Sequence, residues 1–126
     1  MIHVSDKLLC NTGIYRINSK ADPLLHKVAE LIKSEPSIQV MSEGHTNPRT
    51  SSTGVVEDNW DLSVKRATSI VRKLQEDYKV APEKMIAAGR ASYMPIVDND
   101  TPENMAINRR TRIVLIPDLD MFFAML

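Results

Sequence analysis

The spacing of apolar residues constrains the fold of this chain most, because it switches between helical and extended periods along the sequence. The clearest helical segment begins at Asp58, and its apolar residues recur at intervals of three or four: Trp60, Val64, Ala67, Val71, Leu74 and Tyr78. This pattern predicts an amphipathic helix whose apolar stripe faces a sheet. Trp60 is expected at or near the core, and the alternative is that it stacks on a ligand.

A second helix is predicted to begin at Asp22 and Pro23. Proline is well tolerated at the first helical position, and the Asp22 side chain is expected to cap free backbone amides. The apolar residues that follow are again helically spaced and stop before Pro36: Leu24, Leu25, Val28, Leu31 and Ile32. This segment is therefore expected to pack on the same sheet.

Three short segments have the pattern of strands, namely 37–43, 85–88 and 110–116, and Gly44 ends the first of them. The last is expected to be at least half buried, because one set of its residues, Thr111, Ile113 and Leu115, alternates with another, Arg110, Arg112 and Val114. Segment 90–106, with Pro95 and Pro102, is typical of a surface loop leading into a short helix. With a first strand near the N-terminus, the order is β-α-β-α-β-β. We expect an α/β sandwich with one mixed sheet, covered on one face by two main helices, in a single domain of residues 1–126.

Composition limits the classes of function. The chain has 126 residues, of which 43% are hydrophobic, so it suits one domain with a real core. Its 16 basic and 16 acidic residues cancel, and the predicted sheet lacks exposed aromatics for base stacking, so nucleic acid is not an expected partner. No stretch is long enough to span a bilayer. The single cysteine, Cys10, cannot form an internal disulfide.

Enzymatic and metal-binding classes are disfavoured. His3, His26 and His45 lie far apart without the spacing of metal ligands, so neither a metal nor a cofactor is expected. Ser63 and His45 lack an acidic partner and an oxyanion-hole pattern, and no phosphate-binding loop is present. We therefore do not expect catalysis.

Three spaced motifs remain: Glu43-Gly44-His45-Thr46-Asn47, then Asn59-Trp60-Asp61-Leu62-Ser63-Val64-Lys65-Arg66-Ala67, then Asn108-Arg109-Arg110. Together they resemble the OmpA/MotB C-terminal domain, a bacterial module that binds peptidoglycan, and the resemblance covers roughly residues 4–117. It implies noncovalent binding of the diaminopimelate stem peptide of peptidoglycan. It also implies a periplasmic location in the cell envelope, with an anchor upstream of Met1.

The resemblance implies a set of site residues. Diaminopimelate ends in an ammonium and a carboxylate, and Arg66 stands where the family's arginine holds that carboxylate with two hydrogen bonds. The other residues expected to line the ligand are Asn47, Thr46, Asn59, Leu62, Ala67 and Arg109, supported by His45, Ser63, Asn108 and Arg110. Because Arg66 lies beside the predicted apolar stripe, it is expected at the rim of a pocket. Asn59 is also expected to cap its helix.

Asn47 departs from the family pattern, which has an aspartate there to receive the ammonium. An amide oxygen accepts a hydrogen bond but carries no charge, so the change is expected to weaken binding by about 1 to 3 kcal/mol. Glu43 and Glu57 are the nearest acids that would compensate. The alternative function is an OmpA-like assembly domain, of an envelope or motor-stator type of complex, that no longer binds peptidoglycan.

Two further segments carry expectations. The polar segment 48–57 is expected to lie over the pocket, between Asn47 and the helix near Asn59. The C-terminal segment 118–126 is apolar and includes Phe122 and Phe123. It is expected to form a helical turn or two that packs on the domain's own sheet, or alternatively serves as a homodimer contact.

Overall fold

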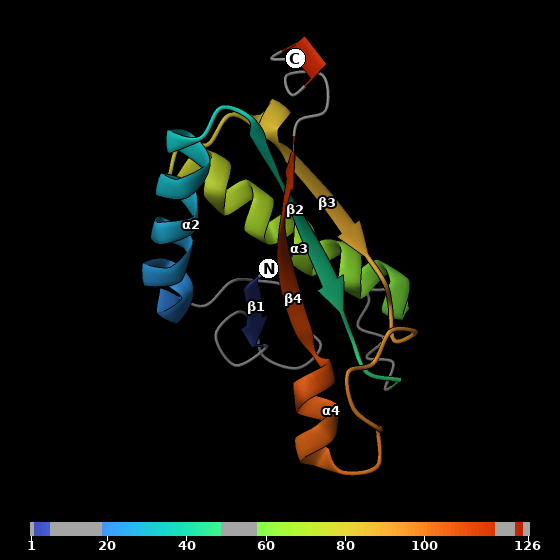
Figure 1. Ribbon diagram of the computed structural model, residues 1–126. Helices are drawn as coiled ribbons and strands as arrows, with labels where there is room; N and C mark the ends of the chain where they lie inside the picture. The colour runs from blue at the N-terminus through green and yellow to red at the C-terminus, as the bar shows by residue number, and fades with distance from the viewer. Residues whose placement is uncertain (1, 6–18, 49–57, 118–122, 125–126) are drawn as a thin grey trace.

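The computed structural model describes residues 2–5, 19–48, 58–117 and 123–124 (Figure 1). Its main elements are β1 (Ile2–Ser5), α2 (Asp22–Ser34), β2 (Ile38–His45), α3 (Asn59–Glu76), β3 (Met85–Gly89), α4 (Pro102–Asn108) and β4 (Arg110–Pro117). Two short 3₁₀ turns, η1 (Ser19–Ala21) and η2 (Pro82–Lys84), precede α2 and β3. The predicted order of strands and helices is confirmed, including the short helix before the last strand.

The four strands form one mixed sheet in the order β1-β4-β2-β3. β2 pairs in parallel with β3 and antiparallel with β4, whose other edge pairs antiparallel with β1. The helices α2 and α3 pack on one face of this sheet (Figure 1). The structure therefore has the predicted α/β architecture.

The core lies between these two helices and the central strands. It is built from Leu25, Val28 and Ile32 of α2, Ile70 and Leu74 of α3, Val40 of β2 and Ile113 of β4, with Ala21, Ala29 and Val80. In β4, Thr111 and Ile113 are fully buried, and Leu115 packs against the core, as the alternating pattern predicts. Burial of this apolar surface is the main stabilising contribution.

The buried face of α3 matches the prediction in part, since Ala67 and Leu74 are buried and Tyr78 packs against the core. Trp60 is 50% exposed and Val64 is 42% exposed, so neither belongs to the core. The buried residues of α3 are Leu62, Ser63, Arg66, Ala67, Ile70 and Leu74. Ser63 and a methyl group of Val64 both lie close to Gly89, so Val64 contacts the sheet although it is partly exposed.

Both predicted helix caps are also wrong in their details. Ala21 occupies the N-cap of α2 without a side-chain hydrogen bond. Asp22 instead accepts a hydrogen bond from Tyr78 Oη at 2.9 Å and forms an ion pair with Lys73 Nζ at 3.2 Å, which ties α2 to α3. The hydrogen bonds from Tyr78 and then Lys73 lower the pKa of Asp22. In α3, Asp58 is the N-cap, and Asn59 is the first helical residue.

Several expectations fall outside the described residues. These concern the segment around Cys10, the loop expected over the pocket at residues 49–57, and most of segment 118–126. Of that last segment only residues 123–124 are described, and Phe123 is 64% exposed. Among the helices that the structure describes, none combines the length and hydropathy needed to cross a bilayer.

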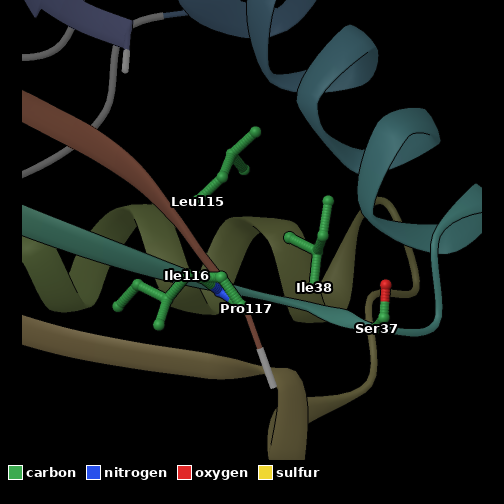
Figure 2. A pocket seen from close by; sticks show the side chains of 5 residues that line it. All are labelled: Ser37, Ile38, Leu115, Ile116 and Pro117. Carbon is green, nitrogen blue, oxygen red and sulfur yellow. The ribbon is translucent and has the colours of Figure 1, made fainter. Parts of the chain in front are cut away.

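A hollow of about 220 Å³ lies at the end of the sheet where β2 begins and β4 ends. Its lining is mainly apolar and comprises Ser37, Ile38, Leu115, Ile116 and Pro117 (Figure 2). The first sequence motif, Glu43 to Asn47, lies at the opposite end of β2. This hollow is therefore not part of the predicted site.

Candidate functional site

Close packing of two glycines against Ser63 positions the start of α3 on the sheet. A Cβ added to Gly44 would lie 2.0 Å from the carbonyl oxygen of Ser63, and one added to Gly89 would lie 2.5 Å from Ser63 Oγ. Only glycine permits backbones to approach this closely. The end of β2 and the first turns of α3 are therefore brought together, as the first two sequence motifs require.

Hydrogen bonds through Ser63 and Ala91 then fix the chain that leaves β2. The Ala91 amide donates to Ser63 Oγ at 3.1 Å, and the Thr46 amide donates to the Ala91 carbonyl at 2.8 Å. Ser63 Oγ itself donates to the Trp60 carbonyl at 2.9 Å. Ala91 has a φ of 49°, a left-handed conformation that glycine adopts more readily. Thr46 and the first turn of α3 therefore share one hydrogen-bonded support.

Polar side chains are buried around this support. Thr46, Asn47, Ser63 and Arg66 are each at most 4% exposed. Thr46 Oγ1 and Asn59 Oδ1 are buried atoms for which no hydrogen-bond partner is found in the described part of the chain. A buried oxygen without a partner is energetically unfavourable, and a ligand donor would satisfy it.

The sequence predicted Arg66 at the rim of a pocket. The structure places it elsewhere. It is 2% exposed and lies on the buried face of α3, one turn after Ser63. The observed buried face of α3 includes Ser63 and Arg66, whereas Trp60 of the predicted stripe is half exposed. Leu62 and Ala67 are buried on the same helix.

A second polar cluster contains Glu43 and His45, which alternate along β2 with Gly44 and so face the other side of the sheet. His45 Nε2 lies 2.6 Å from Glu43 Oε1, and both residues are buried. Arg90 Nε lies 3.6 Å from the other carboxylate oxygen. Glu43 is therefore already paired and cannot replace the missing charge at Asn47.

The charges around this pair set its protonation. Burial raises the pKa of Glu43, but the hydrogen bond with His45 and the charges of His45, Arg112 and Arg90 outweigh that effect and lower it below its ordinary value. Burial lowers the pKa of His45 and outweighs the hydrogen bond with Glu43, and the charge of Arg110 lowers it further. At neutral pH, His45 is therefore neutral, and Nε2–H donates to the Glu43 carboxylate. This supports the predicted structural role of His45.

Asn108 and Arg110 hold the loop between β3 and α4. Asn108 Oδ1 accepts from the amides of Ile96 at 2.8 Å and Val97 at 3.2 Å, while Nδ2 donates to the Val97 carbonyl at 2.8 Å. Arg110 donates to the carbonyls of Asn108 and Met94, both at 3.0 Å. Both residues thus support local structure. Arg109 follows α4 and is partly buried.

Sequence reasoning missed one feature of this region, an aromatic pair formed by Trp60 and Tyr93. Their ring centroids are 5.3 Å apart, with an interplanar angle of 38°. The helical spacing assigned Trp60 to the core, and nothing in the sequence linked it to Tyr93. Within the described ranges, no group of three or more histidine, cysteine or acidic residues is arranged to hold a metal ion.

The fold and these motifs define an OmpA-like α/β domain. The profile of the OmpA family matches residues 11–109, and the chain belongs to this family.

Individual relatives share this region. The chain is 35% identical over 112 residues to the uncharacterized protein YtxE of Bacillus subtilis, covering 89% of this chain and 46% of that protein. It is 27% identical over 117 residues to Motility protein B of the same species, covering 93% of this chain and 45% of the relative. The peptidoglycan-binding protein ArfA of Mycobacterium tuberculosis is 36% identical over 96 residues, covering 73% and 27%. The chain thus spans less than half of each relative.

Solved structures agree with the fold. A MotB-like protein from Desulfovibrio vulgaris superposes with a TM-score of 0.82 at 25% identity, covering 91% of this chain and 73% of the other. The cell wall anchor of the T6SS from Pseudomonas aeruginosa superposes with a TM-score of 0.80 at 26% identity, covering 91% and 78%.

Proposed function

We propose that this domain binds peptidoglycan noncovalently, through the diaminopimelate stem peptide, and so attaches an envelope protein to the cell wall. Family membership supports the general class, since relatives include a protein named for peptidoglycan binding and a structure described as a cell wall anchor. On this proposal the domain acts in the periplasm, with an anchor in a longer parent protein. No catalytic step is assigned to it.

The observation that carries the proposal is the buried polar set around Arg66. A guanidinium provides the planar pair of donors that a carboxylate accepts. Thr46 Oγ1 and Asn59 Oδ1 are buried oxygens without a hydrogen-bond partner among the described residues, and an ammonium or amide of the ligand would supply donors. Asn47, next to Thr46, would contribute its amide oxygen. Leu62, Ala67 and Arg109 would complete the lining.

Burial of the site has a consequence for binding. Arg66 and Asn47 are both 2% exposed, so a ligand reaches them only after neighbouring atoms move. That rearrangement opposes binding and lowers the apparent affinity. Asn47 lowers it further, because a neutral amide replaces a carboxylate. We therefore propose that this chain binds the stem peptide weakly.

The test is a titration of a diaminopimelate-containing muropeptide, followed by amide chemical shifts so that weak binding is detected. We expect the unmodified chain to bind, and Asn47→Asp to bind about ten- to a hundredfold more tightly. Arg66→Ala is expected to abolish detectable binding. Arg72→Ala is the matched control, because Arg72 is an exposed arginine on the same helix. Equal affinity of the Arg66→Ala variant and the control would contradict the assigned site.

The second candidate is an assembly domain without a cell-wall ligand, which the missing charge at Asn47 favours. In that case only Asn47→Asp, or neither version, binds the muropeptide. A homodimer contact through segment 118–126 remains a prediction. Sedimentation of the full chain against a version with Phe122 and Phe123 changed to serine would test it.

A further inference from the structure

The aromatic pair of Trp60 and Tyr93 is unusually exposed for side chains of this size. Trp60 is 50% exposed and Tyr93 is 69% exposed, although their centroids are only 5.3 Å apart. Met94 and Ile96, which follow Tyr93 in the same loop, are also exposed. Large aromatics are usually buried, so a local group of exposed ones indicates a contact surface.

The pair is attached to the same support as the proposed stem-peptide site. Trp60 follows Asn59 in the first turn of α3, and its carbonyl accepts from Ser63 Oγ. Tyr93 lies two residues after Ala91, whose amide donates to that same Ser63 Oγ and whose carbonyl accepts from the Thr46 amide. The rings therefore stand beside the candidate site, on the chain segments that also position Thr46 and Asn59.

The loop that carries Tyr93 is held in place before any ligand arrives. The Tyr93 amide donates to the Arg90 carbonyl at 3.3 Å, and Arg110 donates to the carbonyl of Met94 at 3.0 Å. Asn108 holds the amide of Ile96 at 2.8 Å. A rigid aromatic surface loses little conformational entropy on binding, which favours a contact role.

We propose that Trp60 and Tyr93 form a platform on which a sugar ring of the glycan strand stacks. This inference depends on the proposed function, since the stem peptide is covalently attached to that sugar. A pyranose ring presents a face of C–H groups, which the electron-rich face of an aromatic ring attracts, while its hydroxyls stay in water. The two rings carry no charge, which suits a sugar face better than the charged ends of the peptide.

Trp60 provides its own probe, because it is the chain's one tryptophan. Its fluorescence is followed while two ligands are titrated separately: a disaccharide–tetrapeptide that contains diaminopimelate, and the same tetrapeptide without sugars. We expect the sugar-bearing ligand to bind about three- to tenfold more tightly and to change the indole emission more strongly. Tyr93→Ala is expected to remove this difference and leave the affinity for the free tetrapeptide unchanged.

Ile107→Ala is the control, because Ile107 is an exposed apolar residue on α4. It is expected to retain the difference between the two ligands. Equal binding of the two ligands by the unmodified chain would overturn the platform and leave the proposed function standing. Absence of binding by either ligand, in the Asn47→Asp background as well, would overturn both. Concentration-dependent self-association that Tyr93→Ala abolishes would assign the rings to a contact between copies instead.

Discussion

Gly44 and Ser63 are in such close backbone contact that a Cβ on Gly44 would lie 2.0 Å from the Ser63 carbonyl oxygen. This contact fixes the height of α3 above the sheet. It also holds Ser63 at the sheet, and Ser63 and Arg66 are both buried while Trp60 is half exposed. The position of the candidate site therefore depends on the absence of one side chain.

Gly44→Ala is expected to destabilise the domain by about 1 to 3 kcal/mol, because the obstructing atom is backbone and cannot rotate away. Chemical denaturation measures this free energy of unfolding. Ala87→Gly is the control, since Ala87 is an exposed residue on β3, and its cost should stay below about 1 kcal/mol. Equal stability of the Gly44→Ala variant and the unmodified chain would mean that α3 can shift freely on the sheet.

Asp58→Ala is expected to cost about 1 kcal/mol, because Asp58 Oδ1 accepts from the Asp61 amide at 2.8 Å at the N-terminus of α3. Asn59→Ala does not remove this capping hydrogen bond, so it should lower the stability less than Asp58→Ala does. Thermal unfolding of the two variants, compared at the same pH, distinguishes them. A larger loss of stability for Asn59→Ala than for Asp58→Ala would indicate that Asn59 caps the helix, as the sequence suggested.

Asn108→Ala is expected to destabilise the domain by about 1 to 3 kcal/mol, since it leaves partly buried amides of the loop without their acceptor. Amide hydrogen exchange provides a local readout, and the amides of Ile96 and Val97 should lose protection first. Asn104→Ala is the control, because the Asn104 side chain bonds Asp100 at an exposed position. Unchanged exchange at both amides in the Asn108→Ala variant would contradict this role.

His45 is expected to make stability fall as the pH drops below about 6.5, the ordinary pKa of histidine. Its folded pKa lies lower because burial disfavours the cation, as do Arg110 and Arg112, despite the opposing charge of Glu43. In the window between the two pKa values the unfolded chain binds more protons, so stability is lost as the pH falls.

The loss of stability associated with Glu43 begins separately, below about pH 4.5, because its pKa is also lowered in the folded state. When unfolding by urea is measured between pH 7 and pH 5, the free energy of unfolding of His45→Gln should depend less on pH than that of the unmodified chain. His26→Gln is the control, since the His26 side chain is 63% exposed, and it should follow the unmodified chain. If the free energy of unfolding changed with pH equally in all three proteins, His45 would not contribute to the pH dependence of stability.

The sequence by itself determined the order of strands and helices, because the apolar period is a local property of each segment. The alternation in β4 correctly placed Thr111 and Ile113 toward the helices. The three motifs correctly indicated the family, and the profile match supports that assignment. These three predictions do not depend on which segments contact one another in the folded chain.

Tertiary structure alone decided which face of α3 is buried. The predicted stripe and the observed buried face share Ala67 and Leu74, but periodicity alone does not indicate that the polar Ser63 and Arg66 are buried while Trp60 is exposed. Gly44 and Gly89 lie on neighbouring strands, and because they have no side chain, Ser63 of α3 can approach both strands closely. In the folded chain Arg66 is buried, Trp60 pairs with Tyr93, and Thr46, Ser63 and Ala91 share one hydrogen-bonded support. These contacts join residues far apart in the chain, so only the folded structure reveals them.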